Sequence, residues 1–153
     1  MEVTHLTDYA LRVLMYAGTH SRRRVTMREI ATAYDISLEH LRKVVHQLAG
    51  LGYIETSRGR GGGLWLACAP ERIGIGEIVN AFERSMEIVD CDRQPCPLRG
   101  HCALKAAFED ARDAFVDRLE RYTLADLLGN APTVGQIRRI AEPASGARPA
   151  RQG

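Results

Sequence analysis

The chain has 153 residues, 45% of them hydrophobic, and a net charge of +2. This charge is divided into a basic half, residues 1–70 at +3, an acidic segment, residues 71–128 at −4, and a basic end, residues 129–153 at +3. That length suits one domain with an appended element, and the sequence has neither an apolar run near the ~20 residues of a membrane span nor the pattern of a signal peptide. We therefore expect a cytoplasmic protein without a membrane partner, in which reduced thiols favour metal binding or redox chemistry over a disulfide framework.

Three helices are predicted in the first third of the chain. Residues 4–18 carry apolar side chains at helical spacing. Thr26 begins a capping-box sequence, which predicts a short helix over residues 27–34. After a brief turn, Ser37 is a good cap for a helix over residues 38–52, with leucine and valine on one face and basic or polar residues on the others.

The pattern then changes from helical to β. Residues 53–57 and 64–68 are predicted strands, and residues 58–63 between them are too rich in glycine for a helix. Helix, short helix, tight turn, helix and hairpin follow one another as in a winged helix-turn-helix. The predicted fold class is mainly α with a small β-hairpin wing, and residues 1–70 are the predicted DNA-binding domain.

This order of elements favours binding to DNA. The third helix would fit the major groove, while the glycines and arginines of the hairpin loop would suit a phosphate backbone or a minor groove. Each feature alone is also typical of a solvated helix face or a flexible loop, so the prediction depends on their combination. The candidate DNA-binding residues are Thr26, Arg28, Ser37, Leu38, His40, Arg42, Lys43, Arg58, Arg60, Gly61 and Gly62.

The second half of the chain has a different organisation. Residues 71–102 contain a short predicted helix and a cysteine-rich loop, and residues 103–128 contain a long helix followed by a short coda. Residues 129–153 are rich in Pro, Gly, Ala and Arg, so we expect a mostly disordered tail. The long helix carries a narrow apolar seam of the coiled-coil type, formed by Leu104, Phe108, Ala111, Phe115, Leu119 and Tyr122.

Three of the four cysteines lie in the loop, as Cys91, Cys96 and Cys102. Zinc sites usually combine two closely spaced pairs, and this loop has no second pair. Three widely spaced thiolates better suit a larger group such as an iron–sulfur cluster, although free thiols, a disulfide switch or zinc stay open. Cys68 alternates with core leucines and is expected to be a packed thiol, while His101 is a further possible ligand, beside Cys102.

Three stretches together resemble one known family. "LTDYALRVLMYAG", "LEHLRKVVHQLAGLGYIETSRGRGGGLWLA" and the C-x₄-C-x₅-C spacing before a long helix are similar to the NsrR family of nitric-oxide-sensitive repressors. That family belongs to the winged-helix iron–sulfur regulators, which also include the IscR family. The resemblance covers about residues 1–128 and leaves the tail outside it.

The resemblance implies a DNA-binding repressor that is a homodimer and not an enzyme. It implies that Cys91, Cys96 and Cys102 hold a 4Fe-4S cluster, with Asp8 of the partner subunit as the fourth ligand. It also implies that residues 103–128 form the dimerisation helix and coda, with the seam at the interface. Nitric oxide would nitrosylate the cluster, displace its ligands and release operator DNA.

Other functions stay open at this point. An IscR-like or thiol-based regulator, with a 2Fe-2S cluster or none, would sense iron–sulfur status or redox state. A zinc-stabilised transcription factor would use the same thiols. An electron-transfer or catalytic iron–sulfur protein is a third alternative, against which the sequence offers no second cluster motif and no catalytic triad or carboxylate pair.

Overall fold

The computed structural model describes residues 3–83, 85–91 and 95–142. It is mostly helical, with one antiparallel hairpin, so the predicted fold class is confirmed. None of the helices in these residues is long and apolar enough to cross a membrane. The elements in chain order are α1 (His5–Thr19), α2 (Met27–Tyr34), α3 (Leu38–Gly50), β1 (Ile54–Ser57), β2 (Gly63–Leu66), the 3₁₀ turn η1 (Pro70–Arg72), α4 (Ile75–Phe82), α5 (Ala103–Glu120), α6 (Leu124–Leu128) and α7 (Ala131–Ala141).

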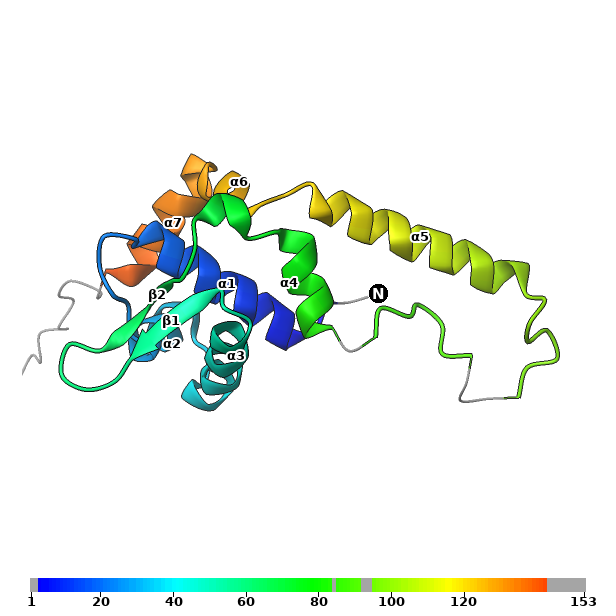
Figure 1. The fold of residues 1–153 in the computed structure, drawn as a ribbon, viewed down its shortest axis with the longest axis horizontal. Coiled ribbons are helices and arrows are strands. Elements are labelled where there is room, and N and C mark those ends of the chain that lie inside the picture. Colours follow the sequence, from blue (N-terminus) through cyan, green and yellow to red (C-terminus); the bar gives the residue numbers. More distant parts are fainter. Residues whose placement is uncertain (1–2, 84, 92–94, 143–153) are drawn as a thin grey trace, which may run out of the picture.

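Helix α1 is the centre of the body. Figure 1 shows it between α3 and the hairpin on one side and α6 and α7 on the other, while α5 extends away from the body. Its residues Ala10, Val13, Leu14 and Tyr16 are fully buried. Burial of each large apolar side chain contributes roughly 1.5–3 kcal/mol, so this helix fixes the positions of the elements around it.

Local signals at the helix ends place α2 and α3 as the sequence predicted. The Thr26 hydroxyl accepts a hydrogen bond from the backbone N–H of Glu29 (3.1 Å), and the Glu29 carboxylate accepts one from the backbone N–H of Thr26 (2.7 Å). Asp35 adopts the left-handed conformation (φ 52) that ends α2, and the Ser37 hydroxyl caps α3. The result is the tight turn of a helix-turn-helix.

The hairpin is fastened to the body by a third segment. Strands β1 and β2 pair in an antiparallel register that joins Ile54 to Leu66 and Ser57 to Gly63. Val25, just before α2, exchanges two backbone hydrogen bonds with Leu64, of 3.0 and 2.7 Å. The wing therefore moves with the start of α2.

The prediction of a disordered tail is wrong for residues 131–141, which form α7. Asn130 caps this helix by accepting a hydrogen bond from the backbone N–H of Thr133 (3.0 Å), and Pro132 lies in its first turn. Ile137 is only 4% exposed and packs into the core. A few apolar residues on one face are enough to hold a helix onto a formed core. The rest of the predicted tail, from residue 143 to the end, lies outside the described residues.

Candidate nucleic-acid interface and candidate metal centre

A groove of about 440 Å³ lies between α3 and the wing. Its walls combine cations, hydroxyl groups and the backbone of the wing glycines, which together suit a phosphate backbone. Four of the predicted DNA-binding residues line it, namely Thr26, Arg42, Arg58 and Gly62. Its other lining residues are Met27, Val45, His46, Ala49, Thr56, Ser57, Gly59, Gly63 and Leu64.

The predicted residues at the start of α3 have different surroundings. The Ser37 hydroxyl accepts a hydrogen bond from the backbone N–H of His40 (3.3 Å) and lies 2.9 Å from His40 Nδ1. Lys43 Nζ forms an ion pair with Glu39 (3.1 Å), whereas Leu38 is half-buried. Ser37 thus caps the N-terminus of α3. The exposed polar side chains that follow it face solvent.

The wing tip requires glycine. Gly59 and Gly61 have φ values of +91 and +78, where other residues are strained. A Cβ atom on Gly62 would collide with the backbone of Ser57. Arg58 and Arg60 are exposed in this turn, as is Arg28 in the first turn of α2.

Sequence reasoning missed Arg24 as a brace of the wing. Its guanidinium lies over the ring of Trp65, 4.7 Å from the ring centre, and its Nη1 donates to the carbonyl oxygen of Gly61 at 3.5 Å. The run of three arginines at residues 22–24 was a local signal of positive charge. Its contact with the wing was hidden, because Trp65 is far away along the sequence.

The three thiols of the loop line one pocket of about 330 Å³ beside the first turn of α5. Cys102 caps that helix, because its Sγ accepts a hydrogen bond from the backbone N–H of Lys105 (3.4 Å). The Arg99 guanidinium donates to the carbonyl oxygen of Cys91 (2.7 Å), and the Arg99 backbone N–H donates to the carbonyl oxygen of Cys96 (3.2 Å). Arg99 therefore ties together the segments that carry the thiols.

The donor set fits an iron–sulfur cluster. All three cysteines are free thiols, and Arg99 in the pocket wall can offset negative charge of bound thiolates, while Lys105 in the same wall is paired with Glu109 (3.6 Å). The pocket is large enough for roughly ten water molecules. Across the described part of the chain, no three His, Cys, Asp or Glu side chains are grouped closely enough for one metal ion.

Comparison with known proteins places this arrangement in a family. The sequence model of the Rrf2 family, which is described as an iron-dependent transcriptional regulator, matches residues 3–130. The chain belongs to the Rrf2 family. This Rrf2 protein is similar to the HTH-type transcriptional regulator NsrR of Bacillus licheniformis, with 42% identity over 141 residues that cover 90% of this chain and 99% of the relative. It is also similar to the HTH-type transcriptional repressor NsrR of Streptomyces coelicolor, with 38% identity over 149 residues, 95% of this chain and 100% of the relative.

Solved structures show the same fold. The oxidised form of CymR from Staphylococcus aureus is 26% identical with a TM-score of 0.69, covering 84% of this chain and 96% of that one. IscR of T. potens has a TM-score of 0.70 at 23% identity, covering 86% and 88% of the two chains. The predicted resemblance to NsrR is confirmed, and this Rrf2 protein is a winged-helix transcriptional regulator rather than an enzyme.

Two further candidate residues of this Rrf2 regulator lie outside the thiol pocket. Cys68 is half-buried and packs against the core, as predicted. Asp8, on α1, forms an ion pair with Arg12 (2.9 Å) and lines a separate groove with Tyr34 and α7. Asp8 is 40% exposed, so its carboxylate is open to a second molecule.

Helix α5 of the Rrf2 chain buries none of its residues. Leu104 is 63% exposed and Tyr122 is 39% exposed. Of the other seam residues, Phe108, Phe115 and Leu119 are half-buried and Ala111 is exposed.

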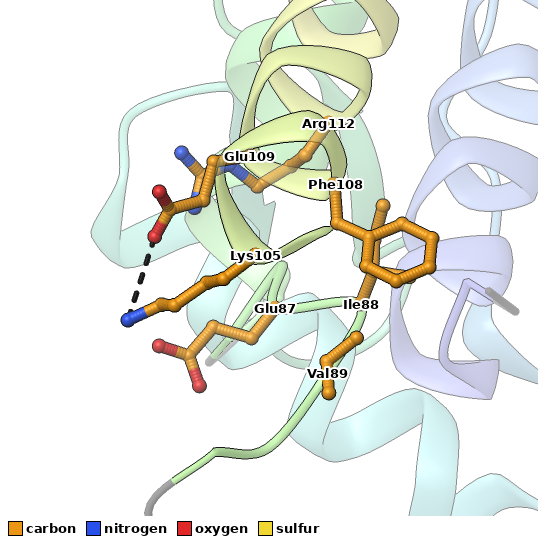
Figure 2. Close-up of a pocket in the computed structure, with 7 residues that line it drawn as sticks. All are labelled: Glu87, Ile88, Val89, Lys105, Phe108, Glu109 and Arg112. Atoms are coloured by element: carbon orange, nitrogen blue, oxygen red, sulfur yellow. Dashed lines mark ion pairs between the residues drawn. The ribbon is translucent and has the colours of Figure 1, made fainter. Parts of the chain in front are cut away.

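Figure 2 shows that the segment before the thiols lies along the start of α5, with Ile88 and Val89 beside Phe108. The Lys105–Glu109 ion pair (3.6 Å) lies on the other side of this contact. Phe108 therefore anchors the thiol segment of its own chain, a role that the sequence did not indicate.

Proposed function

We propose that this Rrf2 repressor senses nitric oxide through a 4Fe-4S cluster and releases operator DNA when the cluster reacts. The observation that carries the proposal is the single pocket shared by Cys91, Cys96 and Cys102. The family's description as iron-dependent and the similarity to NsrR repressors support it. A 2Fe-2S cluster in the same pocket is the alternative cofactor.

When bound, the cluster would supply iron, which binds nitric oxide. The chain's own residues would hold the cluster. The Cys102 sulfur sits at the N-terminus of an 18-residue helix, where a negative charge is favoured. Arg99 supplies positive charge to the same pocket, whereas the charge of Lys105 is shared with Glu109, so Arg99 and the helix end are the features that favour thiolates.

The fourth ligand of this proposal is Asp8 of the partner subunit. A carboxylate is a hard ligand and a weaker partner for cluster iron than a thiolate. Asp8 is therefore the ligand that nitric oxide would displace most easily. In the single chain, Arg12 satisfies this carboxylate with two contacts, of 3.0 and 2.9 Å, so Asp8 has a partner when it is not a ligand.

The dimer would form through α5. A long helix with no buried residue and with Leu104 largely exposed needs a cover, and the apolar seam suits pairing with a second copy. Two copies would place two α3 helices and two wings on DNA. Half-sites about one helical turn apart would follow from that symmetry.

The first experiment is anaerobic purification, with analysis of iron, sulfide and the absorption spectrum, followed by titration with nitric oxide on DNA. The DNA is selected from a random pool by the iron-loaded protein. We expect about four irons per subunit, and loss of absorption together with release of DNA. Zinc, or no metal, with DNA binding indifferent to nitric oxide would contradict the proposal.

A matched pair of variants tests the ligands. Cys96→Ala removes a pocket thiol and should abolish iron binding and nitric-oxide-responsive binding to DNA together. Cys68→Ala removes a thiol outside the pocket and should leave iron content unchanged. Asp8→Ala should retain most of the iron but respond to nitric oxide at a different rate, and an unchanged response would remove Asp8 from the ligand set.

A thiol switch is the second candidate. It is supported by the three free thiols of the loop and by the likeness to CymR of Staphylococcus aureus, of which an oxidised form has been solved. This candidate predicts an iron-free protein whose DNA binding changes with oxidant and is restored by a dithiol. Iron-dependent binding in the titration above would exclude it.

A further inference from the structure

The last turn of α4 is where the thiol segment leaves the body. Phe82, at the end of this helix, is 6% exposed and packs into the core. Glu83 caps the helix and lies eight positions before Cys91. The first thiol is thus eight positions along the chain from the end of α4, and Ile88 in the described part between them lies against α5.

Glu83 is bonded to the first turn of α1. Its Oε1 accepts hydrogen bonds from the backbone N–H of Thr4 (2.8 Å), from the Thr4 hydroxyl (3.0 Å) and from the Thr7 hydroxyl. Thr7 is fully buried, and among the described residues it is the one polar residue that is buried with the apolar core. Hydrogen bonds to an ionised carboxylate are roughly twice as strong as neutral ones, so this contact holds α4 firmly against α1.

The same turn is bonded to the recognition helix. The Gln47 side-chain N–H donates to the carbonyl oxygen of Ala81 at 2.9 Å. Carbonyl groups in the last turn of a helix have no partner inside the helix, so a side chain from outside completes the end of α4. Gln47 follows His46, which lines the groove between α3 and the wing.

We propose that Glu83 and Gln47 are positioning residues that join the thiol segment to the DNA-reading helix. Two residues apart, Ala81 and Glu83 fasten one helix end to α3 and to α1. A change of ligation that displaces the thiol segment shifts this end, and α3 shifts with it because a helix moves as a rigid unit. This role rests on the function proposed above, since it needs two states of the thiol site.

The experiment compares DNA affinity between iron-loaded and iron-free protein. Allosteric coupling typically changes affinity by about 5- to 150-fold. We expect Gln47→Ala and Glu83→Gln to reduce the wild-type ratio severalfold, toward one, with iron content unchanged. The double variant should lose no more than either single variant, because both act on one junction. Glu71→Gln, an exposed charge on η1, should keep the wild-type ratio.

A second readout needs no iron. Amide hydrogen exchange of the iron-free protein should become faster in the first turn of α1 for Glu83→Gln. It should become faster in the last turn of α4 for Gln47→Ala, while Glu71→Gln changes neither. If Glu83→Gln loads no iron, Gln47→Ala, which is remote from the thiols, decides the comparison of affinities.

The outcomes separate this role from the function on which it rests. A wild-type ratio near one overturns the proposed function, and the positioning role with it. A large wild-type ratio that both variants retain overturns the positioning role alone. If Gln47→Ala weakens both forms equally, Gln47 contacts DNA instead, and its role as a coupler is also overturned.

Discussion

Gly63→Ala should loosen the wing from the body. Gly63 is the first residue of β2 and lies beside the segment that pairs with the hairpin. A Cβ atom there would lie 2.7 Å from the carbonyl oxygen of Val25 and 3.1 Å from the Arg24 Cβ atom. Because the closest atom belongs to the backbone, the strand itself has to move.

The expected cost follows from the contacts that the shift disturbs. The two hydrogen bonds between Val25 and Leu64 contribute roughly 1 kcal/mol each, and overpacking adds roughly 1–3 kcal/mol. The lower entropy of alanine in the unfolded chain offsets about 0.5–1 kcal/mol. If both hydrogen bonds are lost, the free energy of unfolding should therefore fall by about 2–4.5 kcal/mol.

Urea unfolding measures this change, and Trp65 reports on the wing because it is the single tryptophan of the chain and lies in β2. We expect a lower midpoint, altered emission in the folded state and weaker binding to DNA. Gly135→Ala is the matched control. Nothing lies within 4 Å of a Cβ atom there, and alanine in a helix interior should stabilise by about 0.5–1 kcal/mol. A loss below about 0.5 kcal/mol for Gly63→Ala, with unchanged emission, would refute the reasoning.

Other predictions concern titration and the wing brace. Burial raises the pKa of Tyr34 to about 12, so its contribution to stability is complete below pH ~10 and is lost as the pH rises toward 12. The variant Tyr34→Phe should therefore lose less stability between pH ~10 and ~12 than the wild type, measured by urea unfolding. Burial raises the pKa of Glu29, but its hydrogen bonds outweigh burial and hold the pKa below its usual value. Its contribution is therefore present above pH ~4.5 and lost as the pH falls through the lowered pKa, so thermal midpoints of Glu29→Gln should depend less on acid. Arg24→Ala should expose Trp65 to a quencher and weaken DNA binding severalfold, whereas Arg22→Ala should leave the quenching unchanged.

Local signals in the sequence predicted the DNA-binding half well. Thr26 and Ser37 cap the helices that they were expected to cap, and the glycines of the hairpin loop form its tight turn. Such signals act over three or four residues, so a single sequence displays them. The helix α7 was missed because its composition resembles a tail, although Asn130 and Pro132 were correct signals for a helix start.

Contacts between distant residues could not be predicted. Gln47 and Ala81 are 34 positions apart, and Thr4 and Glu83 are 79 positions apart. Neither pair has a pattern that reveals it, since Gln47, Thr4 and Glu83 are ordinary polar residues near helix ends and Ala81 takes part only through its backbone carbonyl. Phe108 shows the same difficulty, because its place in the seam indicated an outward role and the structure sets it beside Ile88.

The sulfur of Cys102 has two tasks, because it lines the thiol pocket and also caps α5. A helix that loses its cap typically loses about 0.5–2 kcal/mol and frays at its first turn. Alkylation of this thiol would leave the sulfur its lone pairs but add a bulky group beside the Lys105 amide, and oxidation would change the size and charge of the acceptor. The start of α5 thus depends on the chemical state of the Cys102 sulfur. A reagent that modifies Cys102 is therefore expected to fray the first turn of the helix beside which the thiol segment lies.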